Sequence, residues 1–279
     1  MIDVPYGFFL FVLGGLGLSF GSFANVVIWR FPRGESLTSP PSHCPSCSAS
    51  IAWYDNVPVL SWLLLRGRCR SCGARISARY PLVEVSSCLL WVLAGVVFGM
   101  TGSAGFAVVL FYVLLILTFI DIDHKRLPNV LVGALGVVGI IGVIISRFTR
   151  VPLVPLVGIA GSGLFSQPWL AAASGLVLGG GVSLLITALY GMLRGKAGLG
   201  MGDVKLLAVL GLFLGPYVLM VLMVGSILGA VYGLCTSRRG GDLRSARIPF
   251  GPFLAAGAVL AATVGPAVWT AYARLVGLV

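Results

Sequence analysis

The chain has 279 residues, of which 58% are hydrophobic and only 10% charged, and its formal net charge is +11. A soluble domain of this length could not bury so much apolar surface and stay dispersed, so the composition excludes that class. The lysines and arginines lie mainly in short loops between apolar runs, which indicates membrane topology and contact with anionic lipid rather than nucleic acid. We therefore expect an all-α polytopic membrane protein.

The first apolar run covers residues 6–28 and is too long for the core of a signal peptide. Trp29 and Arg30 follow it, and such residues anchor helices at the membrane interface. We interpret residues 1–29 as a retained transmembrane helix. Residues 30–80 form the one long hydrophilic segment of the chain, and we expect them to make a small domain of their own.

Further apolar runs fill the remainder, residues 81–279, which we interpret as a seven-helix domain. They lie at about 82–100, 104–120, 129–146, 169–193, 204–217, 218–236 and 250–276. The longer runs approach the roughly 20 residues that a helix needs to span a bilayer. With the first helix they predict about eight transmembrane helices, with a tight turn at Gly215-Pro216 between two short ones. Residues 151–168 contain several prolines and glycines and are expected to form a surface loop or a re-entrant segment.

The basic residues predict the orientation of these helices. If the spans alternate, one side receives the loops at 29–81, 121–128, 194–205 and 237–249, and the other holds only Arg147, Arg150 and Arg274. The positive-inside rule then places the four basic loops in the cytoplasm and both termini outside.

Two C-x2-C knuckles lie in the hydrophilic segment, Cys44 with Cys47 and Cys69 with Cys72. Paired knuckles of this kind supply four thiolates to one tetrahedral zinc ion, so we expect a structural Zn²⁺ site. Disulfides and free thiols are the alternatives, and disulfides require an oxidising compartment rather than the cytoplasm. His43 could replace one cysteine ligand.

Acidic residues are rare, and three of them stand at the predicted cytoplasmic ends of spans. Asp121 and Asp123 end the third span, and Asp203 begins the sixth within Gly198-Leu199-Gly200-Met201-Gly202-Asp203-Val204-Lys205. An ionisable group at membrane depth costs roughly 2.5–3.5 kcal/mol, which favours a functional role. Two carboxylates that share a site keep one proton between them, so one can accept a proton from water while the other donates to a carbonyl, as in aspartyl proteases.

Structural alternatives exist for each acid. Asp203 could cap the helix that follows it, and the two acids of the third span could form an interfacial pair with Lys125 and Arg126. The proximity of Asp121 to Asp203 is inferred from topology alone.

Taken in order, these motifs resemble the type IV prepilin peptidases, which are bifunctional leader peptidases and N-methyltransferases in the GxGD class of intramembrane aspartyl proteases. The likeness covers almost the whole chain and includes the cysteine knuckles, the acidic stretches and several shorter motifs. These are Gly21-Ser22-Phe23, Asn25-Val26-Val27, Leu65-Arg66-Gly67, Tyr80-Pro81-Leu82-Val83-Glu84, Leu127-Pro128-Asn129 and Pro249-Phe250-Gly251-Pro252.

The resemblance implies roles for named residues. Asp121 and Asp203 match the catalytic pair, with Gly200, Gly202, Asp123 and Lys205 as support for the catalytic loop, and the four cysteines match a tetrad associated with zinc. The enzyme would lie in the bacterial inner membrane and cut prepilins or pseudopilins of type IV pili or type II secretion after the glycine that ends a basic leader. It would then methylate the new N-terminus with S-adenosylmethionine.

The cofactor site is less defined, because no Rossmann-type G-x-G-x-x-G follows a strand. Asn25, Arg30 and Glu84 flank the hydrophilic segment and are weak candidates to line it, with interface anchors or helix caps as the alternative. Two other classes of function also fit part of the pattern. A proton- or cation-coupled transporter would use the acids as a relay, and a non-catalytic scaffold of a pilus or secretion assembly would use the zinc module for docking.

Overall fold

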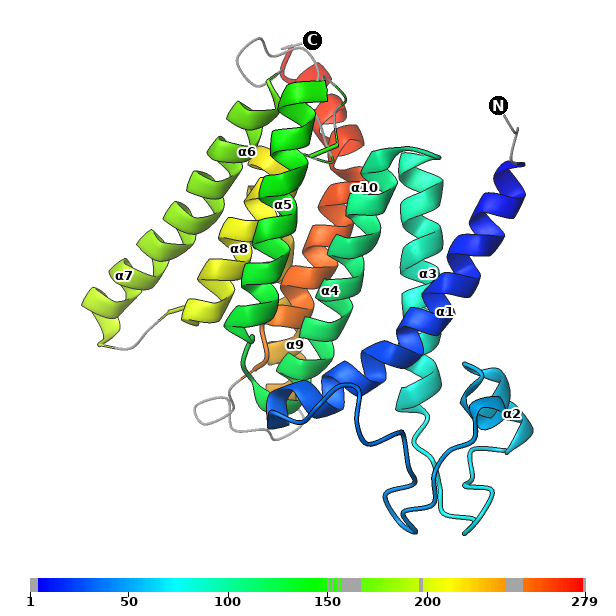
Figure 1. The fold of residues 1–279 in the computed structure, drawn as a ribbon. Helices are drawn as coiled ribbons and strands as arrows, with labels where there is room; N and C mark the ends of the chain where they lie inside the picture. The colour runs from blue at the N-terminus through cyan, green and yellow to red at the C-terminus, as the bar shows by residue number, and fades with distance from the viewer. Residues whose placement is uncertain are drawn as a thin grey trace. The chain divides into compact units, whose positions relative to one another are not determined.

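The structure is a computed structural model that describes residues 5–149, 151, 153, 154, 156, 167–195, 198–238 and 248–277. These residues form helices, with strand-like pairing only at two isolated bridges, His43 with Ser50 and Arg68 with Arg75. The chain divides into two compact units, Met1–Ala104 and Gly105–Val279, which we call unit 1 and unit 2. Figure 1 shows the helices in order along the chain.

Unit 1 contains two long helices with the cysteine segment between them. Its helices are α1 (Tyr6–Arg30), the short α2 (Leu60–Leu64) and α3 (Arg79–Phe98), with single 3-10 turns at Phe31–Arg33 and Trp53–Asn56. Unit 2 contains the remaining helices, of which α4 begins just before the boundary. They are α4 (Gly102–His124), α5 (Asn129–Thr149), α6 (Pro168–Val177), α7 (Ser183–Arg194), α8 (Met201–Leu214), α9 (Val218–Arg238) and α10 (Gly251–Leu275).

Seven helical segments among the described residues are long and apolar enough to cross a membrane. The expectation of an all-helical, multi-pass membrane protein is thus confirmed. The difference from the expected count of about eight lies in one place. Residues 204–217 and 218–236 were expected as two spans, and they fall within one 36-residue candidate segment, Met201–Thr236. Most of the expected loop at 151–168 lies outside the described residues.

The 36-residue segment is not one straight helix. A 3-10 turn at Gly215–Tyr217 divides it, and Gly215 has φ +57°, a backbone conformation that favours glycine. Gly202 near the start of α8 contacts Leu127, and Gly251 at the start of α10 contacts the same leucine, while Gly233 near the end of α9 contacts Ile248. The chain therefore runs away from this end of unit 2 along α8 and returns to it along α9.

Glycines allow the helices of each unit to approach closely. A Cβ on Gly21 of α1 would lie 2.7 Å from the Cα of Glu84 on α3, and one on Gly17 would lie 2.8 Å from the Cα of Cys88. In unit 2, a Cβ on Gly175 of α6 would lie 2.1 Å from the carbonyl oxygen of Gly211 on α8. Small residues four apart are typical of helix interfaces in membranes, where close backbone packing replaces the hydrophobic effect.

The largest buried side chains of unit 2 come mainly from α4, α8 and α10, with smaller contributions from α5, α6 and α9. Phe111, Leu114, Leu210, Phe213 and Leu254 are among its fully buried residues. Many large apolar side chains elsewhere in the unit are exposed, including those of α7 and the outer face of α5. Such a surface fits contact with lipid and would be unfavourable in water.

Candidate functional site

Asp121 and Asp203 lie at the same end of unit 2. Asp121 stands near the end of α4, is only 5% exposed, and its Oδ2 accepts a hydrogen bond of 2.8 Å from the backbone N–H of Gly251 at the start of α10. Asp203 is the third residue of α8, after the cap residue Gly200, and is half-buried. The two carboxylates are close enough for the charge of Asp121 to act on Asp203.

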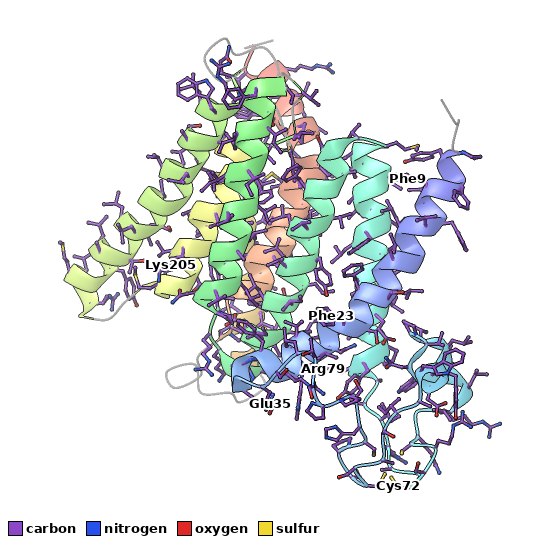
Figure 2. The ribbon with its side chains drawn as sticks, viewed as in Figure 1. Phe9, Phe23, Glu35, Cys72, Arg79 and Lys205 are labelled. Carbon is purple, nitrogen blue, oxygen red and sulfur yellow. The ribbon has the colours of Figure 1, made fainter. Side chains whose placement is uncertain are left out.

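Leu127, in the loop between α4 and α5, connects the two acidic stretches. A Cβ on Gly202 would lie 3.2 Å from the Cβ of Leu127, and a Cβ on Gly251 would lie 3.2 Å from its Cδ2. The loop after α4 therefore contacts Gly202, which precedes Asp203, and Gly251, which hydrogen-bonds Asp121. Lys205 adds a further link, because its Nζ donates a 3.0 Å hydrogen bond to Oδ1 of Asn129 (Figure 2 labels Lys205).

The structure separates Asp121 from Asp123. Asp121 points into unit 2, whereas Asp123 is exposed on the same helix end. Lys125 and Arg126 are exposed too, and no ion pair joins either of them to Asp121 in the described part of the chain. The carboxylate of Asp203 reaches back to the backbone of Gly200, as an acidic third residue does in a capping box. The expected alternative of Asp203 as the N-cap residue is therefore wrong, because Gly200 holds that position and Asp203 lies in the first turn of α8.

Gly251, Leu127 and Asn129 were not assigned a role from the sequence. Gly251 supplies the hydrogen bond that orients Asp121, although it follows Asp121 by many residues in the chain. The available signal was the motif Pro249-Phe250-Gly251-Pro252, because a glycine between two apolar residues at a helix start suits close backbone approach.

The four knuckle cysteines lie together in unit 1, as the spacing predicts. The sulfur atoms of Cys44, Cys47, Cys69 and Cys72 all lie within 4.8 Å of one another, and no disulfide joins them. Sγ of Cys44 and Sγ of Cys72 are 3.9 Å apart. Four thiolates around one tetrahedral zinc, each about 2.3 Å from the metal, would be about 3.8 Å apart. The cluster therefore has the donor set and the dimensions of a metal site.

The two knuckles have the same backbone hydrogen bonds. In the first, the N–H of Cys44 donates to the carbonyl of Ala49 and the N–H of Ser48 donates to the carbonyl of Cys44. In the second, Cys69 donates to Ala74 and Gly73 donates to Cys69. The residue that closes each turn has positive φ, +56° at Ser48 and +71° at Gly73. Each knuckle is thus a local structure that presents its own two sulfurs.

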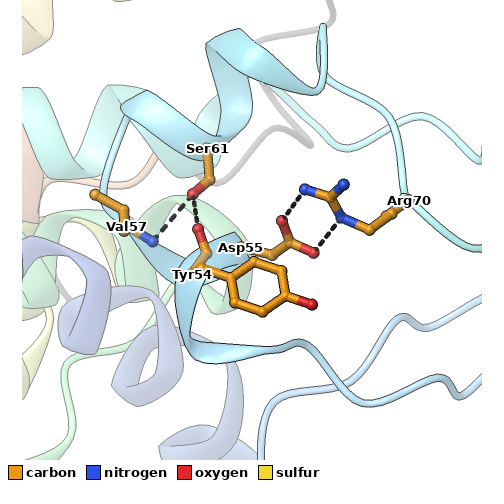
Figure 3. Close-up of polar contacts among 5 residues, drawn as sticks. All are labelled: Tyr54, Asp55, Val57, Ser61 and Arg70. Atoms are coloured by element: carbon orange, nitrogen blue, oxygen red, sulfur yellow. Dashed lines mark hydrogen bonds and ion pairs between the residues drawn. The ribbon is translucent and has the colours of Figure 1, made fainter.

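The thiols differ in their pKa: at Cys72 a backbone hydrogen bond from Ala74 lowers it, but hydrogen bonds with the other cysteines and burial raise it to about 11. Backbone N–H groups of Ser46 and Cys47 hydrogen-bond the sulfur of Cys44 and lower its pKa to about 6, so it is a thiolate near neutral pH. His43 is not part of the cluster in the described residues, and its Nδ1 lies 3.2 Å from the carbonyl oxygen of Pro41. The second knuckle is braced by Arg70, which forms hydrogen bonds of 2.7 and 2.6 Å to the two carboxylate oxygens of Asp55 (Figure 3).

This pair lowers the pKa of Asp55 through the hydrogen bonds from Arg70, and it ties the second knuckle to the 3-10 turn at Trp53–Asn56. On the other side of that turn, the hydroxyl of Ser61 donates to the carbonyl of Tyr54 and accepts from the N–H of Val57, also drawn in Figure 3. The 3-10 turn between the knuckles is therefore held by Arg70 on one side and by Ser61 on the other.

A cavity of about 1190 Å³ lies within unit 1, between the cysteine segment and the ends of α1 and α3. Asn25, Arg30 and Glu84 all line it, so the structure brings the three weak cofactor candidates to one space. Asn25 donates to the carbonyl of Tyr80 at 3.1 Å, and the guanidinium of Arg30, 9% exposed, donates to the carbonyls of Ser36 and Pro40 at 3.0 and 2.7 Å.

Glu84 is the buried carboxylate of this cavity. It is 7% exposed, and its Oε2 accepts a 2.7 Å hydrogen bond from the N–H of Val59. Aromatic rings also line the space, among them Trp29, Tyr54 and Trp62. A large, partly apolar cavity with a few fixed polar groups is typical of small-molecule sites.

The chain is similar to known proteins along most of its length. Residues 16–98 match the family described as "Bacterial Peptidase A24 N-terminal domain", and residues 108–234 match the "Type IV leader peptidase family". A relative from Escherichia coli O78:H11, named "Type 4 prepilin-like proteins leader peptide-processing enzyme", is 36% identical over 87% of this chain and 89% of its own.

Two further relatives carry the name "Prepilin leader peptidase/N-methyltransferase". The protein from Stutzerimonas stutzeri is 35% identical over 94% of this chain and 93% of its own, and that from Pseudomonas aeruginosa is 33% identical over 94% and 92%. No solved structure matches the chain. These likenesses extend across both units, and the chain therefore belongs to the type IV prepilin leader peptidase family.

Proposed function

We propose that the protein is an intramembrane aspartyl endopeptidase that removes the leader of prepilins or pseudopilins and then methylates the new N-terminus. The cleavage reaction is supported above all by the position of Asp121 and Asp203 at the same end of unit 2. The names of the relatives support the same pair of reactions.

In the peptidase reaction the two aspartates take different roles. The buried Asp121 has one oxygen engaged by the N–H of Gly251, whereas Asp203 is half-buried beside it. One carboxylate accepts a proton from the attacking water, and the other, protonated, donates to the oxygen of the scissile carbonyl. Gly200 and Gly202 leave room for the Asp203 carboxylate and for Leu127, and Lys205 holds the start of α8 to Asn129. Asp123 has no catalytic step in this scheme.

The methylation is assigned to unit 1. S-adenosylmethionine supplies a methyl group on a positively charged sulfur. The cavity lined by Asn25, Arg30 and Glu84 has room for such a molecule, because it exceeds the roughly 300–1,000 Å³ of common ligand pockets and contains aromatic rings and a buried cation. The four cysteines hold a structural Zn²⁺ that fixes the segment forming one wall of this cavity.

The proposal includes a location and an orientation. The protein lies in the bacterial inner membrane with residues 30–80 and the aspartates on the cytoplasmic side and both termini outside, as the basic loops favour. Carboxylates at the membrane edge obtain water there, and a substrate with a basic leader and an apolar helix keeps its cleavage site at the same depth.

The test is a processing assay with purified full-length protein in liposomes and a model prepilin. We expect cleavage after the leader glycine, and a further methyl mass when S-adenosylmethionine is added, both read by mass spectrometry of the product. Asp121→Asn and Asp203→Asn should each lower the rate by at least about 10³-fold, because each removes a group that must transfer a proton.

Asp123→Asn is the matched control, since it makes the same chemical change two residues from Asp121 and should retain most of the cleavage. Full cleavage by either of the first two variants would remove that residue from the catalytic pair. If folded wild-type protein leaves several prepilins uncleaved, a proton- or cation-coupled transporter or a non-catalytic scaffold becomes the better explanation.

A further inference from the structure

Among the acidic groups that the structure describes in unit 1, Glu84 alone is buried, and no cation pairs with it there. Asp55 is paired with Arg70, and Glu35 is exposed (Figure 2 labels Glu35). No ion pair reaches Glu84 within the part of the chain that the structure describes. A buried carboxylate is unfavourable unless hydrogen bonds or a positive charge compensate it, so its place on the cavity wall suits a cationic ligand.

The backbone is strained where it contacts this carboxylate. Val59 has φ +61° and ψ −49°, and the N–H of Leu60 bonds the carbonyl of Pro58 at 2.6 Å, which makes a γ-turn of the rare, strained kind. A β-branched residue is unfavourable in this conformation. The strained turn directs the N–H of Val59 to Oε2 of Glu84.

Several other contacts fix the same carboxylate. Gly21 allows α1 to approach the backbone of Glu84, and Ser22 on α1 hydrogen-bonds its side chain. The hydroxyl of Ser61 accepts a hydrogen bond from the N–H of Val57, the residue directly before the γ-turn. Groups from α1, α3 and the cysteine segment thus fix one carboxylate at the cavity, as in a preorganised site, and its bond to Val59 also reaches the cap residue of α2.

We propose that Glu84 binds the newly exposed N-terminal amine of the substrate and takes its proton before methylation. This inference rests on the proposed function and assigns a residue to its second reaction. A primary ammonium has no lone pair, so it must lose a proton to become a nucleophile. The proton passes to a carboxylate oxygen of Glu84, and the amine lone pair becomes free. In the transfer that follows, the N–C bond forms, the C–S bond breaks, and its electron pair stays on sulfur.

The hydrogen bond from Val59 gives Glu84 a defined orientation for this step. The bonds from Val59 and Ser22 use only part of the acceptor capacity of the carboxylate, so acceptor positions remain for the ligand. Val59 and Ser61 are therefore positioning residues, whereas Glu84 itself contacts the amine.

The experiment compares binding of two short peptides that begin with phenylalanine, one with a free amine and one N-acetylated. Full-length protein in detergent is first saturated with S-adenosylhomocysteine, so that binding is measured without turnover. We expect the wild type to bind the free-amine peptide at least tenfold more tightly than the acetylated one. In Glu84→Gln the ratio of the two affinities should fall to about one. The amide oxygen can still accept the hydrogen bond from Val59, but the negative charge is lost.

Asp123→Asn is the control, since it removes an exposed carboxylate that does not line this cavity and should leave the ratio unchanged. An unchanged ratio in Glu84→Gln would overturn the inference. So would weaker binding of S-adenosylhomocysteine by that variant, because Glu84 would then serve the cofactor or the fold instead. Failure of the wild type to methylate a cleaved prepilin would count against the proposed function, whereas full methylation by Glu84→Gln would count against the inference alone.

Discussion

The metal cluster and the aspartate pair are built over very different lengths of chain. Each cysteine knuckle closes on itself through hydrogen bonds between residues four and five apart, and the two knuckles repeat the same bonds. The aspartate site is assembled from the end of α4 and the starts of α8 and α10, and its key hydrogen bond joins Asp121 to Gly251. A local site needs only the right residues in a short segment, whereas an assembled site also needs the helices to pack at the right distance.

This difference sets what can damage each site. The knuckles should be sensitive to the loss of a ligand or to a change in a turn residue, and insensitive to helix packing in unit 2. The aspartate site should be sensitive to small changes in helix contacts that leave both acids in place. The following predictions test this separation.

Among the variants that test this separation, the one that removes a metal ligand should have the largest effect. Cys69→Ser replaces one of four thiolates, and because metal binding and folding are coupled in such segments, bound zinc should be lost and the 30–80 segment should become sensitive to protease. Methylation should fall by at least about 100-fold, since the cavity loses a wall, and cleavage should fall no more than that. Zinc content, limited proteolysis and the two activities measure this.

Cys235→Ser is the control, because Cys235 is a free, exposed thiol on α9 outside the cluster. Loss of cleavage with methylation intact in Cys69→Ser would reverse the assignment of the two reactions to the two units.

A smaller effect is expected from Gly251→Ala. The added Cβ would lie 2.9 Å from Oδ2 of Asp121 and 3.2 Å from Leu127, so the carboxylate must move. A displacement of about 1 Å at a reacting group can cost up to about 100-fold, and we expect cleavage to fall by about 10- to 100-fold while zinc content stays unchanged. Gly133→Ala on α5 is the control, because its Cβ would meet nothing within 4 Å. Equal rates for the two variants would show that the Gly251 contact does not position Asp121.

The same contrast explains what the sequence could and could not predict. The C-x2-C spacing predicted the cysteine cluster, because its geometry is local, and the apolar run at 82–100 predicted α3 (Arg79–Phe98) closely. The hydrogen bond from Gly251 to Asp121 could not be derived, since nothing in either segment specifies its partner. The sequence named Asn25, Arg30 and Glu84 as weak candidates, but the bond from Val59 to Glu84 could not be derived, because it depends on a turn with positive φ at Val59. Residues 204–236 were ambiguous because a glycine turn within a continuous apolar run leaves no polar break.

The smallest effect tests whether the two knuckles are equivalent. Ser48 and Gly73 occupy the same position after the first cysteine of each knuckle, both with positive φ, but only glycine adopts that conformation without strain. Ser48→Gly should stabilise the first knuckle by about 0.5–1 kcal/mol, because strain of a non-glycine residue there exceeds the entropy cost of glycine.

Gly73→Ser should weaken the second knuckle by a similar amount. The cause would be backbone strain alone, because a Cβ at Gly73 would meet nothing within 4 Å and so would not clash. Competition with a chelator measures both variants on one scale, the chelator concentration that removes half of the zinc. We expect opposite shifts of about two- to fivefold, since 1.4 kcal/mol corresponds to about tenfold. Shifts in the same direction would mean that the shared hydrogen bonds do not give the knuckles the same energetics, and that the metal rather than the turn determines the backbone at Ser48.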